Sequence, residues 1–233
     1  MLEQPIIFHR KDVPDLLVPK DLVVYLKTTE TCQLNCKHCF TNGINGRKIY
    51  FNPDATINWF QNLHQEIPTF NTGSIIFHGG EPFLADLEDM YHTWETVSKL
   101  YPMLSWSCST NLCFNLTDEH RKFFATVLKN GFCTSWDKGI RFETQKQESL
   151  WRNNLQTLVN DGHNITLNIS LNRELLDINT QELVRWLDTL GVNWVQFERL
   201  THDGSATINT DIFPTNQELD RKSTRLNSSH GYI

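Results

Sequence analysis

Three cysteines lie close together near the start of the chain, at Cys32, Cys36 and Cys39 in the stretch "TCQLNCKHCF". They are spaced three residues and then two residues apart. A [4Fe–4S] cube has four irons, so three thiolates leave one iron without a protein ligand and open to an outside molecule. Zinc is the alternative, with His38 as a fourth ligand, because structural zinc takes four ligands in a closed tetrahedron.

The composition limits the kind of protein that carries these cysteines. The chain has 233 residues, 39% of them hydrophobic, which suits a single domain because α/β barrels run to roughly 200–250 residues. The formal net charge of −6 and the lack of a basic run argue against nucleic acid as a partner. No apolar run approaches the ~20 residues of a membrane span, and the N-terminus lacks a signal-peptide pattern. We therefore expect a cytoplasmic protein whose six cysteines are metal ligands or buried thiols.

The sequence predicts one core domain between two terminal segments. We assign residues 1–20 to an N-terminal extension, 21–215 to the core and 216–233 to a disordered or artefactual tail. The end "RKSTRLNSSHGYI", from Arg221, is polar and resembles translated adapter or vector sequence. We expect a natural chain that continued further, and a native disordered tail is the alternative.

Strand and helix patterns alternate along the core. Apolar and β-branched stretches predict strands at 21–28, 74–78, 104–110, 131–136, 164–172 and 192–200. Helical spacing occurs at 54–67, 86–100, 148–162 and 180–191, and Thr117 is the expected N-cap of a further helix that ends before Gly131. This alternation predicts a parallel sheet with right-handed crossovers. Six units are too few for a closed eight-stranded barrel, so we predict an α/β fold with an open partial (β/α)6 barrel.

The fifth predicted strand has one apolar and one polar face. The apolar face carries Ile165, Leu167, Ile169 and Leu171, and the polar face carries Thr166, Asn168, Ser170 and Asn172. A strand with four polar positions on one side is not packed only into a hydrophobic core. We expect this face to line a lumen that holds a polar ligand. The alternative is an edge strand with a solvated outer face.

The cysteine triplet resembles the signature of the radical S-adenosylmethionine (radical SAM) enzymes. In that family the three cysteines have this spacing, and a ring residue usually precedes the third cysteine. Here His38 takes that place and Phe40 follows the third cysteine. The resemblance implies that Cys32, Cys36 and Cys39 ligate a [4Fe–4S] cluster and are central to catalysis.

A second resemblance is "GGEP", formed by Gly79, Gly80, Glu81 and Pro82, at the end of the second predicted strand. It follows the triplet by about 40 residues, which is where the family has this segment. Glycine lets the backbone approach a ligand closely because it has no Cβ. In the family this backbone accepts hydrogen bonds from the amino group of SAM, so these four residues are candidate cofactor-binding residues, as are His38 and Phe40.

Softer matches imply further contacts to SAM. The stretch "STN" ends the third strand at Asn111, where the family often has a Thr-Asn pair. The segment "TSWDKGIRF" resembles "SLDG…R" of peptide-modifying members, which implies that Ser135 and Arg141 contact the ribose and carboxylate of SAM. Asn168 and Ser170 are candidates for the rest of SAM.

The resemblance implies a reaction. In the family, the reduced cluster cleaves SAM to methionine and a 5′-deoxyadenosyl radical, which removes a hydrogen atom from the substrate, and a flavodoxin or ferredoxin is the expected reductant. The nearest group is the peptide and protein maturases (SPASM-type, similar to anaerobic sulfatase maturases), so we expect a peptide or protein side chain as substrate. A nucleotide or small metabolite is the alternative within the family. Outside it, the alternative is a non-catalytic zinc-binding or inactive fragment.

Several other polar residues have simpler interpretations. We expect Cys108 and Cys133 to be small buried residues in strands, Cys113 to lie in a loop near the mouth, and His78 to be a strand histidine. Glu198 and Arg199 end the sixth strand, where they face the substrate or form a surface ion pair.

Overall fold

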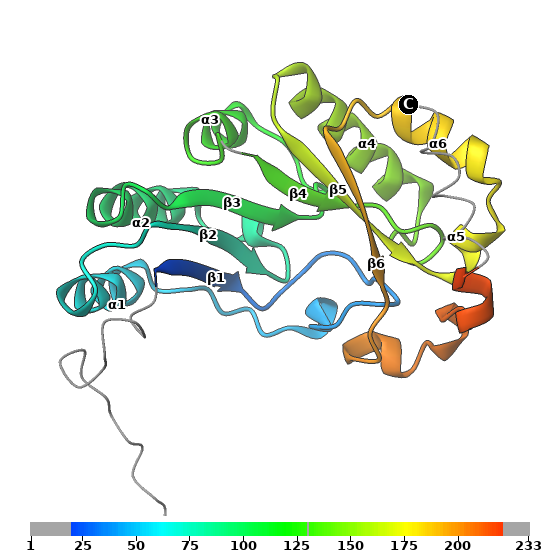
Figure 1. The fold of residues 1–233 in the computed structure, drawn as a ribbon, viewed down its shortest axis with the longest axis horizontal. Helices are drawn as coiled ribbons and strands as arrows, with labels where there is room; N and C mark the ends of the chain where they lie inside the picture. Colours follow the sequence, from blue (N-terminus) through cyan, green and yellow to red (C-terminus); the bar gives the residue numbers. More distant parts are fainter. Residues whose placement is uncertain (1–19, 130, 221–233) are drawn as a thin grey trace, which may run out of the picture.

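The computed structural model describes residues 20–129 and 131–220. The expected N-terminal extension, apart from residue 20, and the stretch from residue 221 lie outside the described residues. Six strands form one sheet: β1 (Asp21–Thr29), β2 (Thr72–Gly79), β3 (Ser105–Thr110), β4 (Phe132–Ser135), β5 (Ile165–Leu171) and β6 (Trp194–Arg199). Neighbouring strands are parallel and follow the order of the chain, so β1 and β6 are the edges (Figure 1). This confirms the predicted open α/β partial barrel, with strand bounds within two residues of those predicted.

Helices connect the strands. They are α1 (Pro53–Glu66), α2 (Leu87–Leu100), α3 (Asp118–Thr126), α4 (Gln145–Asn160), α5 (Arg173–Asp177) and α6 (Thr180–Asp188). The predicted cap of α3 is confirmed, because the Thr117 hydroxyl accepts from the His120 backbone N–H. Helix α4 begins at Gln145 rather than 148, because Thr144 and Gln147 form a capping box there. Within the described ranges, no helix is long and apolar enough to span a membrane.

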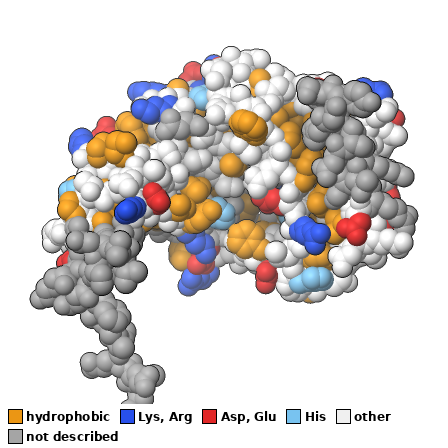
Figure 2. All heavy atoms as spheres, in the orientation of Figure 1, with side chains coloured by type: hydrophobic (Ala, Val, Ile, Leu, Met, Phe, Trp, Pro, Cys, Tyr) orange, Lys and Arg blue, Asp and Glu red, His pale blue; other side chains and the backbone are white. Residues whose placement is uncertain are grey.

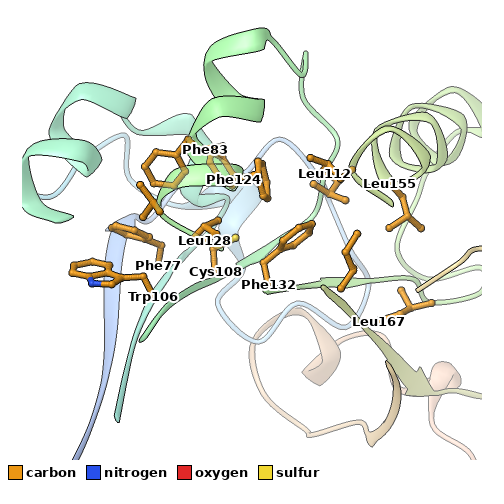
Figure 3. Close-up of a cluster of buried hydrophobic side chains, with 14 of the residues drawn as sticks. Phe77, Phe83, Trp106, Cys108, Leu112, Phe124, Leu128, Phe132, Leu155 and Leu167 are labelled. Carbon is orange, nitrogen blue, oxygen red and sulfur yellow. The ribbon is translucent and has the colours of Figure 1, made fainter. Parts of the chain in front are cut away.

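Alternating side chains divide the sheet into two faces. Those that point toward the helices are buried and form the core, as Phe77, Trp106, Phe132 and Leu167 show (Figure 3). The intervening positions on the central strands are mostly small and polar and are only partly buried. The same alternation that builds the core therefore gives the sheet a polar concave face.

Strand β5 confirms the polar lumen at three of its four predicted positions. Because β5 pairs with both β4 and β6, it is not an edge strand. Thr166, Asn168 and Ser170 share the partly buried face. The prediction for Asn172 was wrong: this residue is fully buried and its side chain accepts from the Leu175 backbone N–H, as the N-cap of the unpredicted helix α5.

Strands β3 and β4 share fewer paired residues than any other two neighbouring strands of the sheet. Only Ser109–Cys133 and Thr110–Thr134 are paired there. Below these pairs the strands separate, and the Ser107 hydroxyl donates to the carbonyl oxygen of Gly131 at 3.0 Å. A cavity of about 230 Å³ lies in this gap.

Strand β6 is exposed on most of its length. Figure 2 shows hydrophobic side chains on the viewed surface among charged and uncharged ones, and Trp194 and Val195 are among the exposed apolar residues of the protein. After β6, two short 3-10 helices, η5 (Gly204–Thr207) and η6 (Thr210–Ile212), form a small second core with Ile140. Residues 216–220 are helical, so the expected domain boundary at 216 falls at the start of a helical segment.

Candidate functional site

A cavity of about 410 Å³ opens on the concave face of the sheet, at the carboxyl ends of the strands. This is the end of an α/β barrel where ligands bind. Most of the residues singled out from the sequence line it: Cys32, Cys36, His38, Cys39, Phe40, Gly79, Gly80, Asn111, Ser135, Arg141, Asn168, Ser170 and Glu198. The fold therefore brings residues from Cys32 to Glu198, which are far apart in the sequence, around one cavity.

The cysteine loop is held by backbone hydrogen bonds from three parts of the chain. The Cys32 N–H donates to the carbonyl oxygen of Gly43 at 2.8 Å, which closes the loop on itself. The Lys37 N–H donates to the carbonyl oxygen of Ile140, and the Ser205 N–H donates to that of Cys39, both at 2.8 Å. The loop is thus fixed between the segment after β4 and the segment after β6.

Two of the three cysteine sulfurs accept hydrogen bonds from N–H groups. Cys32 Sγ accepts from the Leu34 backbone and from Asn111 Nδ2, both at 3.4 Å. Cys39 Sγ accepts from the Gly43 backbone at 3.4 Å. Such donors orient and stabilise sulfur ligands that carry negative charge. The predicted role of Asn111 as a SAM contact remains a prediction, and its amide group already supports Cys32.

Burial favours the neutral thiol at Cys32 and Cys36 in the protein alone. Burial raises the pKa of Cys32, and it raises the pKa of Cys36 to about 12. Iron or another cation must therefore displace the thiol protons when it binds. Within residues 20–129 and 131–220, no three His, Cys, Asp or Glu side chains converge as they do around a single metal ion. All three thiols line the same cavity.

Gly79 and Gly80 bring the end of β2 against the start of the cysteine loop. A Cβ on Gly79 would lie 2.3 Å from the carbonyl oxygen of Thr29, and φ at this residue is 147°. A Cβ on Gly80 would lie 2.0 Å from the carbonyl oxygen of Thr31. The glycines are therefore required for a close approach between two backbones, and both also line the cavity.

The other two residues of "GGEP" lie away from the cavity wall. The Glu81 carboxylate is fully buried and accepts from the Thr110 hydroxyl and the Asn111 N–H, both at 2.7 Å. Burial raises its pKa to about 7, although these hydrogen bonds act in the opposite direction. Pro82 is buried at the start of a short 3-10 helix. The Glu81 side chain thus joins the ends of β2 and β3.

Asp137 is the central polar residue beneath the cysteine loop, and the sequence did not single it out. Its carboxylate accepts from Arg141 Nε at 2.6 Å and from the Ser170 N–H at 2.5 Å, and lies 3.1 Å from His38 Nε2. Burial alone would raise the pKa of Asp137, but Arg141 and His38 lower it below its ordinary value. The network connects the cysteine loop, the segment after β4 and strand β5.

Two polar atoms at the site lack a partner in the described residues. They are Asn168 Oδ1 and His38 Nδ1, and both are buried. A buried polar atom without a hydrogen bond is costly unless a ligand or water satisfies it. Together with the N–H donors on the sulfurs, these atoms fit a cavity built to hold a polar cofactor beside a sulfur-ligated cluster. Ser135 and Ser170 lie on the same wall.

Three cysteines and one histidine near the site had simpler interpretations in the sequence. Cys108 is buried, as expected, and Cys113 lies buried in a loop. Cys133 is a correction, because it is only partly buried and lines the cavity. His78 also lines the cavity, and burial lowers its pKa. The alternation of buried and partly buried side chains along β2 and β4 was the signal that places His78 and Cys133 on the concave face.

Comparison with known proteins agrees with this geometry. Residues 22–130 match the family model described as a 4Fe-4S single cluster domain, whereas no curated protein sequence matches. The fold is similar to that of anSMEcpe with bound AdoMet, at a TM-score of 0.62 and 16% identity, covering 78% of this chain and 52% of that chain. It is also similar to Streptococcus suis SuiB bound to S-adenosylmethionine, at a TM-score of 0.60 and 14% identity, covering 91% and 47%.

SuiB bound to its precursor peptide SuiA gives a similar match, with a TM-score of 0.58 and 15% identity over 91% of this chain and 46% of that chain. The chain therefore shares the open parallel fold of these AdoMet-bound proteins, and its first half matches a 4Fe-4S single cluster domain. It spans about half the length of the solved proteins that it matches.

Proposed function

We propose that this chain is the core of a radical SAM enzyme that acts on a peptide or protein side chain. The observation that carries the proposal is the shared cavity, which Cys32, Cys36 and Cys39 line together with Asn168 and Ser170. One cluster with an open iron and one SAM molecule would account for both groups of residues.

In this proposal the three cysteines hold a [4Fe–4S] cluster, and SAM binds beside it. When bound, the cluster supplies one electron to SAM, and SAM supplies the radical that removes hydrogen from the substrate. The protein orients these groups and leaves the cofactors to carry out the difficult chemistry. The backbone of Gly79 and Gly80 faces the cavity without a side chain in the way.

The chain's own residues fix the positions of the groups. Asp137 holds Arg141 and His38 in place by direct contacts, so the cavity wall does not need to reorganise when a cofactor binds. Asn168 Oδ1 is available to accept a hydrogen bond from a hydroxyl or amino group. Arg141 carries a positive charge that could approach a carboxylate, although Asp137 already balances it.

A peptide substrate is supported by two of the similar structures. SuiB was solved bound to the precursor peptide SuiA, and anSMEcpe with bound AdoMet and the Kp18Cys peptide. The open side of the sheet between β1 and β6 would admit an extended chain. A small electron-transfer protein such as a flavodoxin or ferredoxin would supply the electron. The six cysteines are all free, which suits the reducing cytoplasm that we propose as its location.

Anaerobic reconstitution tests the proposal. The wild-type chain should bind about four irons, and adding SAM and dithionite should release 5′-deoxyadenosine. Cys36→Ala should lose the cluster and this product. Cys113→Ala is the matched control, because it removes a buried thiol that does not line the cavity. Zinc in place of iron, or a complete cluster in Cys36→Ala, would overturn the proposal.

A further inference from the structure

Glu198 is the one acidic residue among the described residues that line the 410 Å³ cavity. It lies near the end of β6, where Glu198 pairs with Ser170 in the strand register. The one Lys or Arg side chain among the same lining residues is Arg141, and Asp137 balances its charge at 2.6 Å. The cavity therefore contains one negative charge without a compensating positive charge.

Among the residues that the structure describes, the carboxylate of Glu198 has no cationic partner. Within residues 20–129 and 131–220, it forms no ion pair with a Lys, Arg or His side chain. Its described hydrogen bond comes from Gln196 Nε2 at 3.2 Å. The neighbouring Arg199 does not line the cavity, because successive side chains on a strand point to opposite faces. The surface ion pair considered from the sequence is therefore not formed.

The field of Glu198 reaches the floor of the cavity. Burial raises the pKa of Cys133, and the charge of Glu198 raises it further. Both residues line the cavity, and Cys133 also lines the smaller cavity below it. A positive group that enters between β1 and β6 would thus meet an attractive potential.

Two exposed aromatic rings line the same cavity. Tyr25 is 67% exposed and Phe40 is 60% exposed. Both rings contact the His78 ring, with centroids 5.9 and 6.0 Å apart. Aromatic faces attract ammonium and guanidinium groups and also pack against their methylene chains. A carboxylate and aromatic rings that line one cavity provide suitable contacts for a long cationic side chain.

We propose that Glu198 selects a substrate with an ammonium or guanidinium group, such as a lysine or arginine side chain, in the segment that enters the cavity. The inference rests on the proposed function, because it gives the substrate class for the same cavity. Glu198 is exposed, so the expected preference is modest, about three- to tenfold in the dissociation constant.

Synthetic peptides test this preference. Three acetylated and amidated hexapeptides, identical except for a central Lys, norleucine or Glu, are titrated into the anaerobically reconstituted protein with SAM present and without reductant. Wild type should bind the Lys peptide most tightly. Glu198→Gln should bind the three about equally, and Glu198→Lys should prefer the Glu peptide. Glu95→Lys has the same charge change on an exposed position of α2 and should behave as wild type.

Other results would overturn the inference. One is that wild type binds none of the peptides measurably. Another is that Glu198→Lys keeps the wild-type order of affinities. A third is that Glu95→Lys also comes to prefer the Glu peptide. A loss of SAM affinity in Glu198→Lys without a change in peptide order would assign the charge to the cofactor. Failure of the proposed function is separate, because it appears as missing iron or missing 5′-deoxyadenosine in wild type, which the peptide titration does not measure.

Discussion

Arg141 Nε donates to Asp137 Oδ2 at 2.6 Å, in a pair whose side chains are 14% and 1% exposed. Removing one partner of a buried pair leaves the other charge unsatisfied and typically costs about 3–5 kcal/mol. Asp137→Ala should therefore lower the free energy of unfolding by about this amount, measured by urea denaturation of the metal-free protein. Asp137→Asn should lose less, because an amide oxygen still accepts hydrogen bonds.

The matched control is Glu30→Ala. Glu30 forms a two-point ion pair with Arg47 at 2.7 and 2.8 Å, but this pair lies on the surface. Exposed pairs contribute little to stability, so Glu30→Ala should leave the free energy of unfolding nearly unchanged. Equal losses in Asp137→Ala and Glu30→Ala would show that burial gives the Asp137 network no special importance.

Gly80→Ala should disturb the cysteine loop. The added Cβ would lie 2.0 Å from the carbonyl oxygen of Thr31, so the backbone beside Cys32 must move. We expect the variant to retain helical circular dichroism and to bind less than half of the wild-type iron. Gly162→Ala is the control, because φ there is 82° and nothing lies within 4 Å of the new Cβ. It should cost about 1 kcal/mol and keep the full iron content; loss of iron in both variants would contradict the steric explanation.

Glu81 should make stability depend on pH. Burial raises its pKa to about 7 from the ordinary value of 4.5. Between these pH values the folded chain keeps a proton that the unfolded chain has released, so this contribution to stability falls as pH rises and is lost above pH 7. The change should be on the order of 3 kcal/mol. Urea denaturation from pH 4.5 to 8 should show this slope in wild type and not in Glu81→Gln; parallel curves would refute the assignment.

Asn111 should affect the reduction potential of a cluster held by the three cysteines. Its Nδ2 donates to Cys32 Sγ, and hydrogen bonds to the sulfurs are among the factors that set cluster potentials. Asn111→Leu should make the potential more negative in an anaerobic redox titration. Asn154→Leu is the control, because Asn154 donates to the carbonyl oxygens of Leu112 and Phe114 but to no sulfur. Both variants should lose about 1–3 kcal/mol of stability, and a shared shift in potential would exclude the sulfur contact as its cause.

The sequence predicted most strands and helices because their apolar periods are regular. Phe77 and Leu167 lie on the core face for this reason. Helix α5 was missed because its five residues are too few to show a period. Asn172 fitted the alternation of β5 but serves as a helix cap, which the local pattern of polar and apolar residues does not distinguish.

Long-range contacts were harder to predict. The cysteine spacing predicted which thiols would gather, because these residues are close in the chain. The Asp137 network joins residues up to about 100 positions apart, and no local period records such a contact. An acid four residues before Arg141 was the available signal. Glu81 was interpreted as part of a binding motif, which stays a prediction, and its carboxylate accepts hydrogen bonds from Phe83, Thr110 and Asn111.

The narrow seam between β3 and β4 has a consequence for motion. Two residue pairs join these strands, whereas eight pairs join β1 to β2. Bending at this seam would move the glycine wall of β2 relative to the amide and hydroxyl wall of β5. The cysteine loop touches both halves, at Gly80 and at Ile140. Backbone amides of β4 should thus exchange with deuterium faster than those of β2, and metal loading of the loop should slow them by clamping the two halves together.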